Sequence, residues 1–287
     1  GDRARRTLTQ LTRQHLEQLV RDRATIIGRE ANVVSLAVQL QAREVERALA
    51  VESPEARTTY MAQDFDGERP PADLELSTRH LRILRSGRSL PIPISTSEVV
   101  FKIAPAMLRT SMRQDMWRLA LAVPTYRALQ ERYGDLLYWN YTSLGNGIHS
   151  CYPGHGGYPL DFDPRQRRWY VRASQSDQVV WTLPYTDTTS GQAVMTAAMP
   201  VHRPDGTLAG VTAIDTTVAG LLERARLPRF SGSTAKIVAL VPPDWDVTTQ
   251  GELDLSGYAP DQLSMLVVAE QFEAHSEGLW GSPPTRT

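Results

Sequence analysis

The stretch DFDPRQRRWY at positions 161–170 carries more chemical information than any other part of this 287-residue chain. Three arginines, a tryptophan and a tyrosine lie beside a loop whose backbone is restrained by Pro164. The planar guanidinium of arginine binds a carboxylate through two parallel hydrogen bonds. The stretch therefore indicates a site for a small anionic group.

Two later segments, WTLPYTD at 181–187 and GVTAID at 210–215, supply the complementary chemistry. Tyrosine and tryptophan faces attract cations, and a buried aspartate pairs with an ammonium group. A pocket with Arg167 at one end and Asp215 at the other would suit a small zwitterion. Its aromatic walls would be Trp169, Tyr170 and Tyr185. The residues alone leave a structural reading open, because buried aromatics and structural ion pairs are commoner than ligand sites.

Taken together, these motifs resemble the signature of double Cache domains, the extracytoplasmic ligand-binding regions of bacterial transmembrane receptors. The resemblance covers about residues 141–222 and rests on 163–170, 184–187, Gly191, 205–206 and 210–215. Arg168 stands where the usual family motif has proline. The resemblance implies an α+β fold in which a long N-terminal helix runs beside two PAS-like modules with antiparallel sheets. The ligand would sit in the module farther from the membrane.

The resemblance also implies a role for each site residue. In the amino-acid-binding branch, the positions of Arg167 and Trp169 hold the ligand carboxylate. The positions that hold the ammonium are those of Tyr170, Tyr185 and Asp215. Phe162 stands where that branch has a further tyrosine, so one hydroxyl donor is lost. Because a hydrogen bond to a charged group is worth about 1.5–3 kcal/mol, we expect weak amino-acid binding, or another carboxylate or amine as ligand.

Segments 152–159 and 181–185 are similar to sensor regions that precede serine phosphatases of the sporulation and stress-response type. Histidine kinases, chemoreceptors and cyclic-dinucleotide cyclases carry related sensors. The resemblance therefore implies the periplasmic or extracellular part of a receptor, joined to the membrane by segments outside this sequence and dimeric at full length. A bound ligand would shift the population of two conformations and so transmit a signal.

The chain divides into three parts. Residues 6–50 contain no proline and one glycine, and apolar residues recur at sevenfold spacing from Leu19 through Ile26 and Val33 to Leu40. This pattern predicts a long amphipathic helix, so residues 1–60 would form a stalk or spine. Residues 61–230 would form the membrane-distal module with the ligand pocket. Residues 231–287 would form a smaller membrane-proximal module.

Local patterns predict the elements of these modules. We expect helices at 74–85, 114–133 (interrupted at Pro124) and 216–226. Strands are expected at 136–141, 147–152, 179–183, 192–202, 207–214 and 235–241, whereas 263–275 fits a strand or a helix. Turns at 145–147 and 204–206 would join two of the strand pairs as hairpins. No βαβ alternation is visible, which favours a largely antiparallel α+β domain.

Composition excludes several classes of function. The formal net charge of −1 argues against a nucleic-acid partner. The single cysteine, Cys151, rules out an internal disulfide and a multi-cysteine metal cluster. No apolar run reaches the ~18–20 residues of a membrane span, and the charged first residues show no signal-peptide pattern, so we expect a soluble chain.

A rival interpretation concerns His149, Cys151 and His155, which lie close in sequence and could ligate a metal. On a strand, residues 149 and 151 would share one face. With one cysteine and no carboxylate among them, we expect no metal, no cofactor and no catalytic residue. Three hypotheses remain: a ligand-binding sensor, which the motifs favour, a structural or dimerising ectodomain with a non-functional pocket, and a metal-dependent hydrolase.

Overall fold

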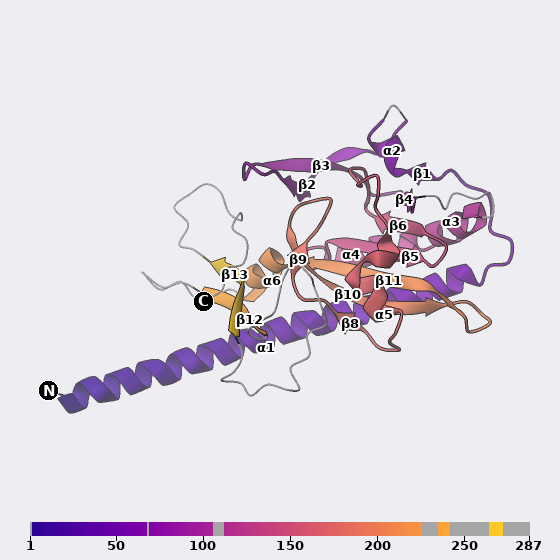
Figure 1. Ribbon diagram of the computed structural model, residues 1–287. Helices are drawn as coiled ribbons and strands as arrows, with labels where there is room; N and C mark the ends of the chain where they lie inside the picture. The colour runs from indigo at the N-terminus through magenta and orange to yellow at the C-terminus, as the bar shows by residue number, and fades with distance from the viewer. Residues whose placement is uncertain (1, 68, 106–111, 226–234, 242–263, 272–287) are drawn as a thin grey trace.

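The computed structural model describes residues 2–67, 69–105, 112–225, 235–241 and 264–271 (Figure 1). Its centre is an eight-stranded sheet in the order β1-β4-β6-β5-β11-β10-β8, with β9 also paired to β10. The strands of this sheet are β1 (Tyr60–Met61), β4 (Val100–Ile103), β5 (Trp139–Leu144), β6 (Ile148–Tyr152), β8 (Val180–Trp181), β9 (Tyr185–Thr186), β10 (Ala193–His202) and β11 (Leu208–Thr217). All described pairings in it are antiparallel except that of β1 with β4.

Both predicted hairpin turns are confirmed. Gly147 adopts a φ of 92° between β5 and β6, and Gly206 a φ of 82° between β10 and β11. Glycine reaches this left-handed region without the steric cost that a Cβ brings. The two hairpins then pair through β11 and β5, which sets Asp215 opposite Trp139 and Ala213 opposite Tyr141.

The long N-terminal helix is confirmed as α1 (Asp2–Leu49), which runs past the sheet and extends beyond it at its N-terminal end (Figure 1). Its C-terminal third packs on β10, β11, α3, α4 and α6. The buried side chains in this third recur three or four residues apart, as Val34, Ala37, Val38, Gln41, Ala42, Val45, Ala48 and Leu49. The predicted sevenfold spacing of buried residues is wrong at Leu40, which is 58% exposed. The buried face of α1 follows the 3.6-residue period of the helix instead.

Three further helices pack against α1: α3 (Met112–Ala120), α4 (Val123–Tyr133) and α6 (Val218–Ala225). The short α2 (Ala62–Phe65) contacts β1 and β4, and α5 (Arg168–Ala173) contacts β10 and β11. Pro124 lies in the first turn of α4, where its missing N–H costs nothing, so it begins a helix after a short break. The predicted helix at 114–133 is therefore two helices.

The predicted helix at 74–85 is wrong. This segment is β2 (Glu75–Ile83), which pairs antiparallel with β3 (Ser89–Ser95). Gly87, at a φ of 81°, turns the chain between the two strands. A third strand, β7 (Gly154–His155), completes this second sheet. Pairing with β3 across this turn overrides the weak local helix pattern.

Successive side chains along the central strands point to opposite sides, which gives the main sheet two distinct faces. All six residues of β5 are buried, because helices cover one face and loops cover the other. Asn140 and Thr142 face α1 and α4, where they contact Gln41 and Tyr126. The odd-numbered residues of the same strand face the opposite way. That second face carries the candidate site.

The C-terminal part of the described chain is the hairpin of β12 (Ala235–Val241) and β13 (Ser264–Gln271). Residues 264–271 thus form a strand, as one of the two alternatives for 263–275 predicted. The last residue of the helix predicted at 216–226 lies outside the described residues. Within the described ranges, no helix contains a stretch apolar enough for a membrane span. The observed α+β architecture, with its long N-terminal helix and separate sheets, confirms the predicted fold class.

Candidate functional site

A narrow cavity lies over the second face of β6, β5 and β11. It encloses about 380 Å³ of empty space with its mouth included. The space suits a small ligand. Its lining includes five of the six predicted ligand residues, namely Phe162, Arg167, Trp169, Tyr185 and Asp215.

Asp215, near the end of β11, forms the acidic end of the cavity. Tyr141 Oη donates a hydrogen bond to its Oδ1 at 2.7 Å, and Thr196 Oγ1 donates to the same oxygen at 2.6 Å. Tyr185 Oη lies 2.8 Å from Thr196 Oγ1 and extends the chain of hydroxyls. In the described part of the chain, no hydrogen bond reaches Oδ2 of Asp215. One carboxylate oxygen thus holds the side chain in place while the other is free to meet a ligand.

The position of Asp215 also changes its acidity. Burial, followed by the negative charge of Asp187, raises the pKa of the Asp215 carboxyl to about 7. The hydrogen bonds from Thr196 and Tyr141 and the charge of Arg167 act in the opposite direction. An ammonium group in the cavity would supply the positive charge that a buried carboxylate needs.

Arg167 forms the basic end. The preceding turn is fixed locally, because Asp163 accepts hydrogen bonds from the backbone N–H of Arg165 at 3.0 Å and from its guanidinium at 2.9 and 2.7 Å. This pair leads into the short helix η1 (Pro164–Gln166) and then α5 (Arg168–Ala173). Arg165 is thereby neutralised. The guanidinium of Arg167 has no ion-pair or hydrogen-bond partner among the described residues, and it lines the cavity.

Trp169 and Tyr170, both on α5, are placed differently. Trp169 is buried, and its ring packs edge-on against Tyr141 at 4.9 Å between centroids. Tyr170 is also buried and packs against Trp169, but it does not line the cavity. The fold thus brings Trp169 to the site and leaves Tyr170 behind it as support.

The wall above β6 is built from aromatic and imidazole rings. Tyr158 Oη lies 3.3 Å from His149 Nε2 and 3.1 Å from His155 Nε2. Phe162 packs edge-on against His149 and Tyr158, with centroids 5.1 and 5.3 Å away. Burial lowers the pKa of His149 to about 3 and that of His155 to about 4, so both imidazoles are neutral at pH 7.

The metal interpretation gains no support from this wall. His149 and Cys151 do share the cavity face of β6, as alternation predicted. Tyr158, however, lies between the two imidazoles and hydrogen-bonds with both. Among the residues that the structure describes, no group of three or more histidine, cysteine, aspartate or glutamate side chains is placed to hold a metal ion.

The loop between β9 and β10 also lines the cavity, through Asp187, Thr188 and Thr189. Asp187 caps the turn of this loop, because its Oδ2 accepts from the N–H and the hydroxyl of Ser190 at 2.8 and 2.6 Å. The loop is tied to β2, since Arg82 Nε donates to the carbonyl of Thr189 at 3.0 Å and Ile83 N to that of Ser190 at 2.7 Å.

Sequence reasoning missed Trp139 and Tyr141, the cavity residues on β5. The two residues are two positions apart on a predicted strand, so both lie on one face of it. This spacing is the sequence signal by which they could have been found together. Deciding that this face meets Asp215 requires the pairing of β5 with β11, which the two hairpins do not specify by themselves.

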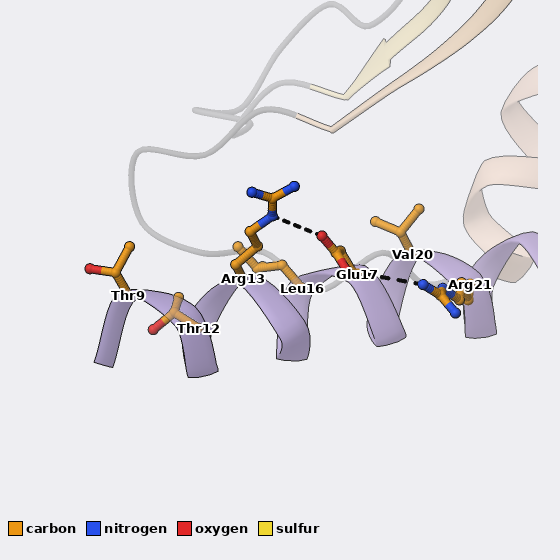
Figure 2. Close-up of a pocket in the computed structure, with 7 residues that line it drawn as sticks. All are labelled: Thr9, Thr12, Arg13, Leu16, Glu17, Val20 and Arg21. Atoms are coloured by element: carbon orange, nitrogen blue, oxygen red, sulfur yellow. Dashed lines mark hydrogen bonds and ion pairs between the residues drawn. The ribbon is translucent and has the colours of Figure 1, made fainter. Parts of the chain in front are cut away.

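A second concavity lies on the N-terminal part of α1, far along the chain from these residues (Figure 2). Leu16 and Val20 form its apolar floor, and Glu17 pairs with Arg13 at 2.9 Å and with Arg21 at 4.0 Å. All its lining residues belong to one helix. It is therefore a shallow helix face, and the cavity over the sheet remains the candidate ligand site.

Comparison with known proteins places this geometry in a class. Residues 127–223 match the family model described as methyl-accepting chemotaxis protein-like, first PDC sensor domain. The chemotaxis protein PscA of Pseudomonas syringae is 32% identical over 113 residues, which are 39% of this chain and 16% of that protein. PctB of Pseudomonas aeruginosa is 30% identical over 99 residues, 33% of this chain and 16% of that protein.

Among solved structures, the ligand-binding domain of PctB in complex with L-Arg is 27% identical to this chain. The TM-score is 0.34, and the match covers 42% of this chain and 51% of that one. The chain spans only about a sixth of the length of the curated relatives it matches.

The fold, the cavity and the family model define residues 127–223 as a ligand-binding sensor domain, which is a binding class and not a class of enzyme. More particularly, this segment matches the model of the first PDC sensor domain of methyl-accepting chemotaxis proteins, and it is similar to PscA over 113 residues. These relatives give no support to the expected link with a serine phosphatase or a histidine kinase.

Proposed function

We propose that this chain is the extracytoplasmic sensor region of a chemoreceptor-like membrane receptor, and that its cavity binds a small zwitterion of the amino-acid class. The observation that carries the proposal is the pairing of two incompletely satisfied charged groups in one small cavity. Arg167 has a guanidinium without a partner among the described residues, and Asp215 has one carboxylate oxygen without a hydrogen bond.

The ligand carboxylate would bind at Arg167. A guanidinium offers two parallel N–H donors that match the two oxygens of a carboxylate. Arg165, two residues earlier, already makes this kind of contact with Asp163, whereas the guanidinium of Arg167 has no such partner among the described residues. The indole of Trp169 closes the space beside it.

The ligand ammonium would bind at Asp215 Oδ2. The hydroxyls of Tyr141 and Thr196 hold the carboxylate through Oδ1 and orient Oδ2, and the Tyr185 hydroxyl bonds that of Thr196. Asp187 adds a second negative charge to the same cavity. Phe162 offers no hydroxyl, so the ring contributes shape without a hydrogen bond.

Hydrogen bonds connect this end of the cavity to α1. Gln41 of α1 is fully buried, and its Nε2 lies 2.9 Å from the carbonyl of Ala213 and 3.3 Å from that of Tyr141. Both carbonyls belong to the strands that carry Asp215 and its tyrosine partner. Closure of the cavity around a ligand would therefore bias the position of α1, to the extent that the ligand prefers one conformation.

The wider organisation is part of the same proposal. Residues 61–230 would form the membrane-distal module, and residues 231–287, which include β12 and β13, would form the membrane-proximal module. The full-length receptor would be a homodimer, anchored by segments outside this sequence. Its output would be that of a chemoreceptor rather than of a phosphatase, since the relatives that match the sensor are chemotaxis proteins.

The test is a thermal-shift screen of the chain with amino acids, simple carboxylates and simple amines. A ligand at 100 times its dissociation constant stabilises the folded state by about 2.7 kcal/mol. We expect shifts with amino acids that disappear in Arg167→Ala and persist in Arg85→Ala, a matched change at an exposed arginine outside the cavity. Amino acids that leave the melting temperature unchanged, or shifts that survive Arg167→Ala, would overturn the proposal.

A further inference from the structure

The wall made by His149, Tyr158 and His155 is not needed to hold a carboxylate or an ammonium group, yet it lines a large part of the cavity. The wall rises from β6 and β7, whereas Asp215 lies on β11, with β5 between them. Adjacent strands are about 4.8 Å apart, so two spacings separate the two strands by about 10 Å. A zwitterion anchored at Asp215 would extend its remaining atoms over β5 toward this wall.

The direction of every hydrogen bond in the wall follows from one backbone carbonyl. His155 Nδ1 lies 2.8 Å from the carbonyl oxygen of Gly156, which can only accept, so Nδ1 carries the proton. In a neutral imidazole, Nε2 of His155 must then accept, and the donor to it is Tyr158 Oη. With its own proton used, the Tyr158 oxygen accepts from Nε2–H of His149.

The same logic fixes the far end of the chain of hydrogen bonds. Because Nε2 of His149 carries the proton, its Nδ1 is an acceptor, and Ser143 Oγ donates to it at 2.7 Å. Every polar hydrogen of the two imidazoles, the phenol and the serine is therefore already used within the wall. Cys151, which also lines the cavity, makes a side-chain hydrogen bond with Tyr158. What the wall offers to a ligand is therefore ring surface.

The charges around the wall also disfavour an acidic ligand side chain. Burial keeps both imidazoles neutral at pH 7, since the pKa values of His149 and His155 lie far below that pH. Asp187, Thr188 and Thr189 line the same cavity, and the Asp187 carboxylate adds a negative charge to it. The nearby guanidinium of Arg82 is not part of the lining, and its Nε donates to the Thr189 carbonyl.

We propose that the wall formed by His149, Tyr158 and His155 is the subsite for the ligand's side chain, and that it selects short uncharged side chains over acidic ones. The selection rests on the proposed binding of an amino acid. An acidic side chain would lose its water, find no N–H or O–H donor on this wall, and face Asp187. An apolar or amide side chain needs no such donor.

Three ligands of nearly equal size test the proposal: L-valine, L-asparagine and L-aspartate, titrated by calorimetry at pH 8. We expect L-aspartate to bind at least about tenfold more weakly than the better of the other two. Tyr158→Phe removes the hydroxyl that uses the His149 Nε2 proton and frees that donor. In this variant the preference should shrink by about a factor of ten.

Tyr126→Phe is the matched control, because it removes a buried hydroxyl that bonds Thr142 on the helix face of the sheet, away from the cavity. It should leave the preference unchanged. Equal or tighter binding of L-aspartate by the wild type would overturn the subsite and leave the proposed function standing, whether or not Tyr158→Phe folds. Absence of binding by all three ligands, with no thermal shift from any other amino acid, would overturn both.

Discussion

The hydroxyl of Tyr141 on β5 donates a 2.7 Å hydrogen bond to Asp215 on β11. The two residues lie on adjacent, hydrogen-bonded strands and on the same face of the sheet. Their contact fixes one oxygen of the carboxylate inside the cavity and leaves the other toward the space where an ammonium group would bind. The electrostatic behaviour of the site depends on this arrangement.

Ligand affinity should depend on pH through Asp215. Because the pKa of the free carboxyl is raised to about 7, an ammonium ligand must displace a proton below that pH and none above it. Affinity for an amino acid should be about tenfold weaker at pH 6 than at pH 8. Calorimetry at pH 6 in two buffers of different ionisation enthalpy should also show proton release. Equal affinities at the two pH values would contradict the role of Asp215.

The stability of the ligand-free protein should show the opposite trend. Asp215 binds its proton more tightly in the folded state than in the unfolded chain, so its contribution to the free energy of unfolding falls as the pH rises from about 4 to about 7. Asp215→Asn removes this titration. The difference in melting temperature between Asp215→Asn and wild type should therefore move in favour of the variant between pH 5 and pH 8. A difference that is constant with pH would show that Asp215 does not titrate in this range.

Phe162→Tyr should strengthen amino-acid binding. The ring already lies in the cavity lining between His149 and Tyr158. A hydroxyl on it restores the donor that the resembling amino-acid-binding domains have at this position. We expect about a tenfold gain in affinity, corresponding to about 1.4 kcal/mol. Titration of both proteins with the same amino acid measures it, and a loss of affinity would mean that the added oxygen does not fit.

Gln41→Ala should destabilise the fold. The side chain makes hydrogen bonds to Asn140, Thr212 and the carbonyl of Ala213, all at 2.8–2.9 Å and all buried. Its removal leaves a cavity and unsatisfied polar groups, which together cost about 2–4 kcal/mol. Urea denaturation measures the loss. Leu40→Ala, one residue earlier and 58% exposed, should change the stability by no more than about 0.5 kcal/mol. Similar effects of the two changes would contradict the role of Gln41.

The parts of this structure that sequence predicts best are those with strong local signals. The proline-free N-terminal segment gives α1, and the glycines at 145–147 and 206 give two hairpins. The motif that contains Arg167 and Trp169 brings both residues to the cavity. These signals act over a few residues or one helical turn. They can therefore be recognised without knowing which distant segments pack against them.

Other features depend on contacts between distant segments. Residues 75–83 form a strand that pairs with β3, and this hairpin is held by distant segments, because β3 pairs with β7 and Ile83 N donates to the carbonyl of Ser190. Tyr141 joins the site because β5 pairs with β11 in one particular register. Tyr170 shows the reverse case, since it follows Trp169 in the motif but points away from the cavity lining. Register and side-chain direction are properties of the assembled sheet.

The central claim is that one ligand is held at both ends, by Arg167 and by Asp215. Calorimetric titration with L-valine, L-valine methyl ester and N-acetyl-L-valine tests it most directly, because each derivative lacks one of the two charged groups. The account predicts that L-valine binds to the wild type and that each derivative binds at least about a hundredfold more weakly, by about 2.7 kcal/mol. Binding of either derivative as tightly as L-valine, or no binding of L-valine at all, would contradict it.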